Sequence, residues 1–421
     1  MTARLRKYDY RKGVQSKMKF IEGSVTASKG FTASGLHCGM RKNRAKKDLA
    51  LIFASCRCDA AAIYTQNKVK GAPILVTREH IADGKAQAFL CNSGNANTCN
   101  ADGVEKANAM CACVSKELGI PEDDIVIAST GVIGQPIYVE PVVSAAPALV
   151  KLLSKDGAGD AVDAIMTTDT HRKEAAAEFE INGRTCRVGG IAKGSGMINP
   201  NMATMLCFIT TDADIASECL HKALKTAADE TFNMVCVDGD TSTNDMAAVL
   251  ASGLAGNDRI TGEGGALDAF TAALTAVMRK LARGIARDGE GATKLIECVV
   301  SGAADKTSAK AVAKAVISSN LFKAAMFGSD ANWGRVLCAV GYADANVDIS
   351  KVDVAFESIA GRVDVCRGGM GVEFSENDAS SVLMRSEIKV LVSLGGGAFG
   401  ATAWGCDLTY DYVKINGDYR T

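Results

Sequence analysis

One segment near the middle of the chain constrains the protein more than any other. Residues 193–211 read KGSGMINPNMATMLCFITT. They pass from a flexible Gly-Ser-Gly, through a turn at 199–201, into an apolar strand that we expect to begin near Thr204. A small residue directly before a hydroxyl residue, Ala203-Thr204, suits an N→O acyl shift at a tight strand entrance. In that reaction the threonine hydroxyl attacks the preceding carbonyl.

Hydrolysis of the resulting ester would free Thr204 as a new N-terminus. Its α-amine, with a pKa of about 8, could then take the hydroxyl proton, so that one residue supplies both nucleophile and base. The same pattern also fits an ordinary loop followed by a strand, because threonine is common in strands and Gly, Asn and Pro are common in turns. The pattern alone leaves both interpretations open.

Composition excludes several classes of protein. The chain has 421 residues, enough for two or three domains, and its 48% hydrophobic and 23% charged content is typical of soluble globular proteins. Because 47 basic residues nearly cancel 48 acidic ones, no nucleic-acid surface is indicated. No apolar run approaches the roughly 18 residues of a membrane helix, so we expect a cytoplasmic protein. Residues 1–20 are expected to form a basic N-terminal extension, since no apolar signal segment follows them.

Three patterns that could indicate a metal or cofactor do not hold. The 15 cysteines form no C-x-x-C pair and only four histidines are present, so reduced, buried thiols are expected. Residues 395–400 fit G-x-G-x-x-G, but too little chain follows for a dinucleotide fold. Residues 238–245, DGDTSTND, lack the spacing and closing Glu of an EF-hand and favour an Asx-rich turn near the active site. No metal and no organic cofactor are therefore expected.

Short β-rich runs alternate with amphipathic stretches, which predicts a mixed α/β fold. Helical spacing of apolar residues covers 215–227 and 274–285. Strands are expected at 72–77, 87–91, 124–129, 206–211, 295–300 and 388–394.

The segment KGSGMINPNMATML resembles the self-cleavage signature of the ornithine acetyltransferase family, also called glutamate N-acetyltransferase. The resemblance extends over essentially the whole chain from about residue 20. Asn199 departs from the family, which often has a small apolar residue there, and this leaves the cleavage rate open. The other matching stretches, in order, are NSGNAN (92–97), STGVIG (129–134), IMTTDT (165–170), DGDTSTND (238–245), RDGEGATK (287–294), FGSDANWGR (327–335) and ATAWGCDLTYDYVKINGDYRT (401–421).

The resemblance implies roles for individual residues. Thr204 matches the nucleophile, freed by cleavage after Ala203, and Thr130 with Gly131 matches an oxyanion hole. The implied substrate contacts suit an amino acid, because a lysine can hold a carboxylate and a glutamate can hold an ammonium group. The segment 165–170 offers Thr167, Thr168 and Thr170 as substrate contacts. We choose Thr170 by its distance in the sequence from Thr204, and the choice stays open. The implied contacts are Thr170, Lys193, Thr204, Glu290, Asn416 and Thr421.

The resemblance also implies a fold, an assembly and a reaction. The fold is a four-layer αββα sandwich with a smaller α/β domain, expected roughly at 212–340. Cleavage would give an α chain, 21–203, and a β chain, 204–421, which stay interwoven and pair as an (αβ)₂ heterotetramer. The implied reaction is ping-pong transfer of acetyl from N²-acetyl-L-ornithine to L-glutamate in arginine biosynthesis. The sequence does not tell whether acetyl-CoA also serves as donor.

Two other functions fit parts of the sequence. A self-processing aminopeptidase of the same fold would use the same nucleophile and release amino acids by attack of water. A non-catalytic amino-acid-binding protein would keep the fold without the chemistry. Lys193, Glu290 and the C-terminal residues favour transfer over hydrolysis, and the intact Ala203-Thr204 pair favours an enzyme.

Overall fold

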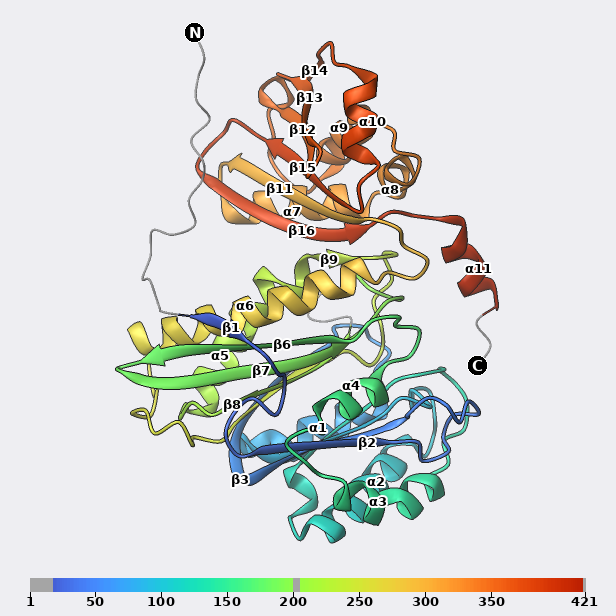
Figure 1. The fold of residues 1–421 in the computed structure, drawn as a ribbon, viewed down its shortest axis with the longest axis vertical. Helices are drawn as coiled ribbons and strands as arrows, with labels where there is room; N and C mark the ends of the chain where they lie inside the picture. The colour runs from blue at the N-terminus through green and yellow to red at the C-terminus, as the bar shows by residue number, and fades with distance from the viewer. Residues whose placement is uncertain (1–17, 200–204, 419–421) are drawn as a thin grey trace.

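The structure is a computed structural model that describes residues 18–199 and 205–418 (Figure 1). Ala203, Thr204 and Thr421 lie outside the described residues. The chain forms two β-sheets. The first has the strand order β1-β6-β7-β8-β10-β3-β4-β5, with β2 paired to β3. Its strands are β1 (Lys19–Ile21), β2 (Phe31–Leu36), β3 (Leu49–Tyr64), β4 (Lys85–Asn92), β5 (Ile125–Ser129), β6 (Lys173–Ile181), β7 (Arg184–Lys193), β8 (Leu206–Thr211) and β10 (Met246–Ala251).

The first sheet is folded into two layers by its longest strand, β3. The first part of β3 pairs with β2 and β4, and its last part pairs with β10. Because successive side chains point to opposite faces, Leu51 enters an outer core while its neighbour Ile52 enters the core between the layers. In that middle core the rings of Phe89 from β4 and Phe208 from β8 lie 5.0 Å apart. Two β layers therefore pack face to face.

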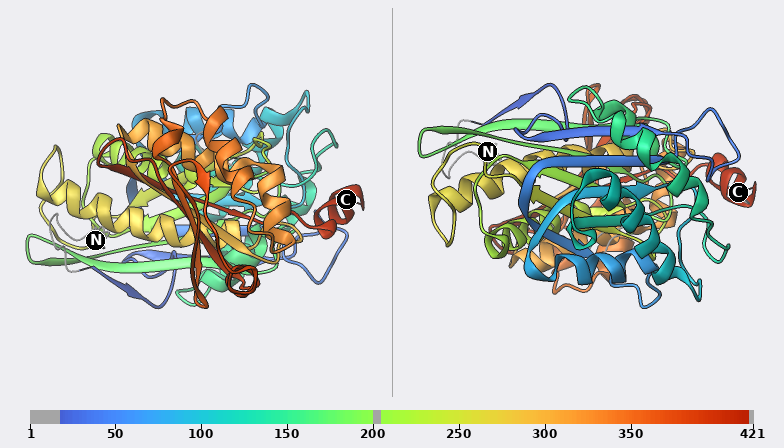
Figure 2. Two further views of the ribbon diagram at one scale, coloured as in Figure 1. Left: turned by 90° about the horizontal axis from the view of Figure 1, so that it is seen from above. Right: turned by 90° about the horizontal axis from the view of Figure 1, so that it is seen from below.

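Helices cover the outer face of each β layer. Helices α1 (Ala72–His80), α2 (Gly103–Leu118) and α3 (Glu140–Lys151) pack on the layer that contains β4 and β5. Helices α5 (Ser217–Glu230) and α6 (Gly265–Arg287) pack on the layer of β6, β7 and β8, and the two groups lie at opposite faces in Figures 1 and 2. The short α4 (Ala158–Ile165) contributes to the middle core. This arrangement confirms the predicted four-layer αββα sandwich.

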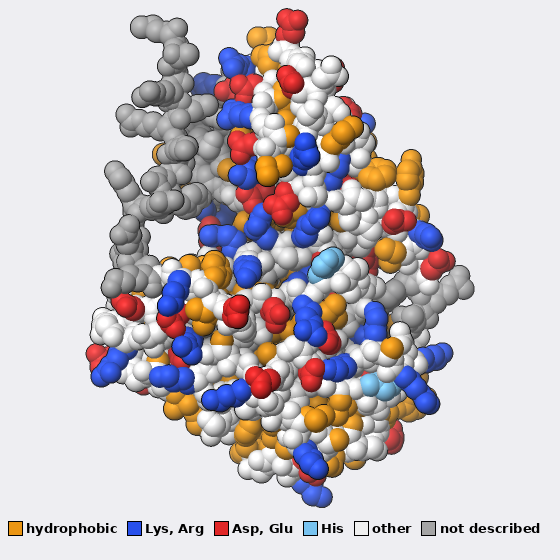
Figure 3. Space-filling view, viewed as in Figure 1, with side chains coloured by type: hydrophobic (Ala, Val, Ile, Leu, Met, Phe, Trp, Pro, Cys, Tyr) orange, Lys and Arg blue, Asp and Glu red, His pale blue; other side chains and the backbone are white. Residues whose placement is uncertain are grey.

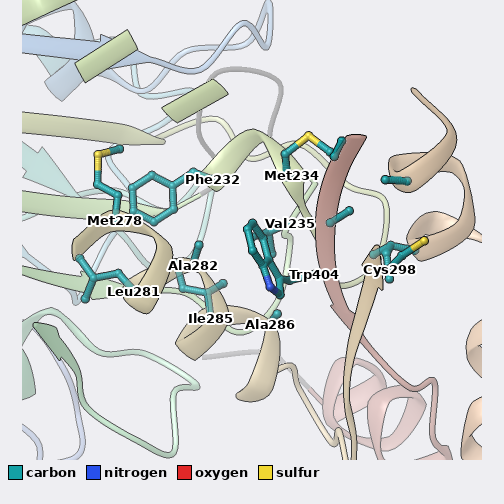
Figure 4. Close-up of a cluster of buried hydrophobic side chains, with 14 of the residues drawn as sticks. Phe232, Met234, Val235, Met278, Leu281, Ala282, Ile285, Ala286, Cys298 and Trp404 are labelled. Atoms are coloured by element: carbon teal, nitrogen blue, oxygen red, sulfur yellow. The ribbon is translucent and has the colours of Figure 1, made fainter. Parts of the chain in front are cut away.

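The second sheet lies beyond α6 and has the order β14-β13-β12-β15-β11-β16-β9. Buried residues of α6, including Ile285, pack near Val235 and Trp404 of this sheet, so the cores of the two parts are continuous (Figure 4). The remaining elements are β9 (Val235–Cys236), β11 (Leu295–Ala303), α7 (Lys306–Ser318), α8 (Asn320–Phe327), α9 (Trp333–Tyr342), β12 (Asp353–Ser358), β13 (Gly361–Arg367), β14 (Met370–Gly371), α10 (Glu376–Leu383), β15 (Glu387–Ser393), β16 (Phe399–Cys406) and α11 (Tyr410–Asp418).

Two sequence expectations differ from the structure. The smaller domain takes its strands from 295–406 with β9, whereas the expected range 212–340 also contains α5, β10 and α6, which build the first sheet's layers. The expected strand at 72–77 is wrong, because these residues form the first turns of α1. A short apolar run does not distinguish a strand from a buried helix, and Pro73 sits in the first turn, where its missing N–H costs nothing. The five other expected strands correspond to β4, β5, β8, β11 and β15, although Asp124 and Leu394 each lie one residue beyond the observed strand.

The surface charges are consistent with the composition, and most of the cysteines are buried. Figure 3 shows basic and acidic side chains interspersed over the face that it presents. Burial raises the pKa of the Cys91 thiol to about 12, so this side chain packs as a neutral group. Cys99 and Cys338 are exposed, in contrast to the expectation that the thiols are buried. Within the described ranges, no helix combines the length and the apolar character needed to cross a membrane.

Candidate active site

A cavity of about 140 Å³ lies where the carboxyl ends of β5 and β7 meet the starts of β8 and β10. Met205, the neighbour of Thr204 in the chain, forms part of its wall. Residues far apart in the sequence therefore meet at one sheet edge. Five of the predicted site residues line this cavity, namely Thr130, Gly131, Lys193, Glu290 and Asn416.

The turn after β5 presents Thr130 and Gly131 to the cavity. The Thr130 N–H donates to the carbonyl of Asn92 at 3.0 Å. Gly131 has a φ of +137°, and a Cβ there would lie 2.9 Å from the backbone nitrogen of Asn95. Only glycine fits both the conformation and the close approach. The turn is therefore fixed with a hydroxyl and a glycine backbone at the cavity wall.

Asn244 holds this turn from the loop before β10. Its Nδ2 donates to the carbonyls of Ala96 at 2.5 Å and Ser129 at 2.9 Å. Its Oδ1 accepts from the hydroxyls of Thr98 at 2.5 Å and Thr243 at 2.6 Å. All four of its hydrogen bonds are made, as expected for a buried amide that rigidifies its surroundings. Asn244 lies in the motif 238–245, but the sequence pattern predicted no role for it.

Lys193 brings a buried cation to the cavity. Its side chain is 9% exposed, and Nζ lies 3.4 Å from the Thr130 hydroxyl. Burial lowers the pKa of Lys193, and the carboxylate of Asp169 opposes that shift. Among the residues that the structure describes, no carboxylate oxygen forms an ion pair with its ammonium group. A negatively charged group of a ligand could therefore pair with the ammonium group of Lys193.

Asp169 anchors the backbone beside Lys193. Its carboxylate accepts from the N–H of Gly194 at 2.7 Å and from Nζ of Lys173 at 2.6 Å. Lys173 also donates to Asp288 at 2.5 Å. Burial alone would raise the pKa of Asp169, but the ammonium groups of Lys173 and Lys193 lower it to about 2. The buried carboxylate is therefore ionised at neutral pH.

Thr170 does not line the cavity. Its N–H and hydroxyl both donate to Asp288, so it belongs to the charge cluster behind the site. Thr167 and Thr168 line the cavity instead, and the Thr168 hydroxyl lies 2.6 Å from that of Ser195. The choice of Thr170 as the substrate contact is not supported by this geometry.

Glu290 and Asn416 form the outer part of the site. Nδ2 of Asn416, on α11, donates to Oε2 of Glu290 at 2.8 Å. The Glu290 carboxylate lies against the backbone of Gly196, before the predicted cut. A Cβ on Gly196 would lie only 2.2 Å from Oε2 of Glu290. The Glu290 N–H donates to the carbonyl of Ser195 at 3.0 Å. The matching residue Thr421 lies beyond the described part of the chain.

Asp245 is a further cavity residue that the sequence reasoning did not single out. It is 3% exposed, and its Oδ2 has no hydrogen-bond partner within the described residues. Burial raises the pKa of Asp245 well above its ordinary value, although the charge of Lys193 opposes the shift. No group of three or more His, Cys, Asp or Glu side chains in the described ranges is arranged to hold a metal ion.

The arrangement suits a particular kind of chemistry. A hydroxyl and a glycine backbone on a rigid turn can stabilise a developing oxyanion. A buried ammonium group and an outer carboxylate can hold the carboxylate and ammonium groups of an amino acid. Lys193 and Glu290 supply these two charges.

Asp169→Asn should lower the stability of the protein at neutral pH. The depressed pKa of Asp169 stabilises the folded state above the unfolded-state pKa near 3.8, and this contribution, about 2 kcal/mol, is lost as the pH falls toward 2. Urea unfolding of the wild type and the variant should therefore show a gap that narrows below about pH 4. Asp156→Asn, on the surface, is the control. A gap that stays constant with pH would contradict the assignment.

Comparison with known proteins gives a consistent result. The ArgJ family model matches residues 32–421. The arginine biosynthesis bifunctional protein ArgJ of Symbiobacterium thermophilum is 51% identical, covering 96% of this chain and all of the relative. That of Caldanaerobacter subterraneus subsp. tengcongensis is 48% identical over the same shares. A crystal structure of the Bacillus halodurans protein of that name is 47% identical, covers 51% of this chain and all of its own, and has a TM-score of 0.49. With a match over nearly its whole length, the chain belongs to the ArgJ family, as its motifs predicted.

Proposed function

We propose that the protein is a self-cleaving acetyltransferase of arginine biosynthesis, which moves acetyl from N²-acetyl-L-ornithine to L-glutamate through Thr204. The observation that carries the proposal is the cavity that combines Thr130 and Gly131 with Lys193 and Glu290 beside Met205. Relatives about half identical to this chain are named bifunctional proteins of arginine biosynthesis, which supports the same pathway.

In the first half-reaction the Thr204 hydroxyl attacks the acetyl carbonyl carbon. Its proton passes to the α-amine of the same residue. The Thr130 hydroxyl and the Gly131 N–H stabilise the negative oxygen of the tetrahedral intermediate. The carbon–nitrogen bond then breaks, the departing nitrogen takes the proton, and ornithine leaves an acetyl ester on Thr204. In the second half-reaction the amine of glutamate attacks that ester and regenerates the hydroxyl.

Substrate recognition follows from the charges at the site. Lys193 is buried and hydrogen-bonds only weakly to Thr130, so a carboxylate of the ligand is its natural partner. Glu290, oriented by Asn416, can accept an ammonium group. Glutamate and acetylornithine both carry an α-carboxylate, which explains how one site can serve both. Thr167 and Thr168 are the threonines of their segment that line the cavity and can contact these substrates.

The topology supports association of the two chains after cleavage. Strands β8 and β10 would belong to the β chain, yet they lie between β7 and β3 of the α chain in one sheet. The α and β chains therefore stay interwoven, and we include their pairing as a cytoplasmic (αβ)₂ heterotetramer in the proposal. We also propose acetyl-CoA as a second donor of the acetyl group that glutamate receives.

A covalent acetyl-enzyme is the direct test of this function. Purified protein incubated with N²-acetyl-L-ornithine alone should release one equivalent of ornithine and gain one acetyl group on the peptide that begins TMLCFITT. Peptide mass spectrometry detects the adduct, and Thr204→Ala should not form it. Acetyl transfer without any adduct would exclude the covalent route, and steady release of acetate would indicate a hydrolase.

Thr130→Val should lower kcat about 10²–10³-fold, because it removes one oxyanion donor while keeping the shape of the side chain. The measurement is steady-state acetyl transfer by fully cleaved protein. Thr168→Val is the matched control in the same cavity, and we expect it to change KM more than kcat. An equal fall of kcat in the two variants would argue against an oxyanion role for Thr130.

A further inference from the structure

The loop that leads into β10, residues 237–245, holds the residues before the predicted cut. The carboxylate of Asp238 accepts the N–H of Met197 at 2.6 Å and that of Ile198 at 2.8 Å. The N–H of Val237 donates to the Ile198 carbonyl at 2.7 Å, and Ile198 forms an antiparallel bridge with Thr241. The N–H groups of Met197 and Ile198 and the carbonyl of Ile198 are therefore all hydrogen-bonded to this loop.

Two further features show how closely this stretch is held. Nδ2 of Asn199 donates to the carbonyl of Gly239, and the Thr241 hydroxyl donates to the carbonyl of Asn199, both at 2.9 Å. Met197 has a φ of +57°, a left-handed conformation that is costly for a residue with a side chain. Because Asp238 binds the N–H groups of Met197 and of the next residue, it can stabilise this conformation.

The strand that this loop leads into also holds Met205, the second residue after the predicted cut. The N–H of Met246 donates to the carbonyl of Met205 at 3.0 Å. Met246 then continues as β10 in parallel register with Leu206 of β8. The loop and the first residue of β10, residues 237–246 together, therefore bind the described chain on both sides of residues 200–204.

We propose that residues 237–246 are the template for self-cleavage, with Asp238 as a positioning residue that fixes the chain entering the cut. The inference rests on the proposed function. In the cleavage step Oγ of Thr204 bonds to the carbonyl carbon of Ala203, the carbon–nitrogen bond breaks, and the nitrogen takes a proton. Water then hydrolyses the ester. Holding both flanks reduces the conformational freedom that the attacking hydroxyl must lose, and such positioning strongly affects rate.

The template also has a consequence after cleavage. Residues 197–199 would lie near the end of the α chain, which the predicted cut places at Ala203, while residues 237–246 would lie in the β chain. The hydrogen bonds of Asp238 and Thr241 to the stretch before the cut would then join the two chains. The same contacts would keep Met197 and Ile198 of the α chain in the cavity wall.

The test compares the cutting rates of purified, uncut precursors. Asp238→Ala should cut about 10–100-fold more slowly than the wild type, since a misplaced reacting group costs rate on that scale. Asp238→Asn should be intermediate, because its amide oxygen can accept one of the two N–H groups. Denaturing gels and intact masses over time give the rates. Hydroxylamine, which cleaves esters, should not restore the rate, because the slowed step is ester formation.

Two matched controls separate positioning from other effects. Asp240→Ala removes an exposed carboxylate from the same loop and should cut at the wild-type rate. Tyr412→Phe removes a phenol whose pKa the Asp238 carboxylate raises, keeps that carboxylate and should also cut normally. In a Thr204→Ala background, where no cut occurs, adding Asp238→Ala should change the thermal midpoint little.

The outcomes distinguish this inference from the proposed function. If the wild type is never cut, the proposed function itself fails. If the wild type is cut and Asp238→Ala is cut equally fast, only the template fails. If Asp238→Ala is slow but Asp238→Asn is no faster, or hydroxylamine restores the rate, Asp238 does not position the acyl shift. A fall in the thermal midpoint that matches the fall in rate across the variants would likewise overturn the inference.

Discussion

The geometry of the site depends on the burial of strand β8 between two neighbours. β8 pairs with β7 on one edge and with β10 on the other, and all six of its residues are buried. This register places Lys193 directly opposite Leu206 and Met246 beside it on the other edge. The ends of three adjacent strands thus carry the buried cation, the wall next to Thr204 and the loop with Asn244. Since β8 and β10 lie between strands of the first half, a cut before β8 leaves the sheet intact.

Much of the fold could be predicted from the sequence. Some elements were predicted from local residue patterns, and others only from the resemblance to a known family. Runs such as 206–211 are short, apolar and β-branched, and they form strands as expected. The run 72–77 has the same local character and is a helix, because tertiary packing against β5 decides its conformation. The αββα layering came from resemblance, since β3 must pair with different strands along its length and no local pattern reports that. The range expected for the smaller domain, 212–340, differs from the structure because α5, β10 and α6 belong to the layers of the first sheet.

The site was predicted in part. Thr130, Gly131 and Lys193 stand in contiguous motifs, and the structure brings them together at the cavity. Asn244 was missed because its partners come from distant segments, at Ala96, Thr98 and Ser129, and its role exists only in the folded chain. Thr167 and Thr168 line the cavity, whereas Thr170 contacts Asp288. The spacing of these threonines in the sequence does not predict which of them faces the cavity. The roles of Thr204, Ala203 and Thr421 stay predictions, because they lie outside the described residues.

We propose that Thr204 becomes reactive only when the cut liberates its own α-amine. N-terminal sequencing of the denatured, purified protein tests this most directly. The account predicts two polypeptides, the second of which begins Thr204-Met205-Leu206. A protein that transfers acetyl groups at full rate while it yields a single N-terminus from one unbroken chain would contradict it.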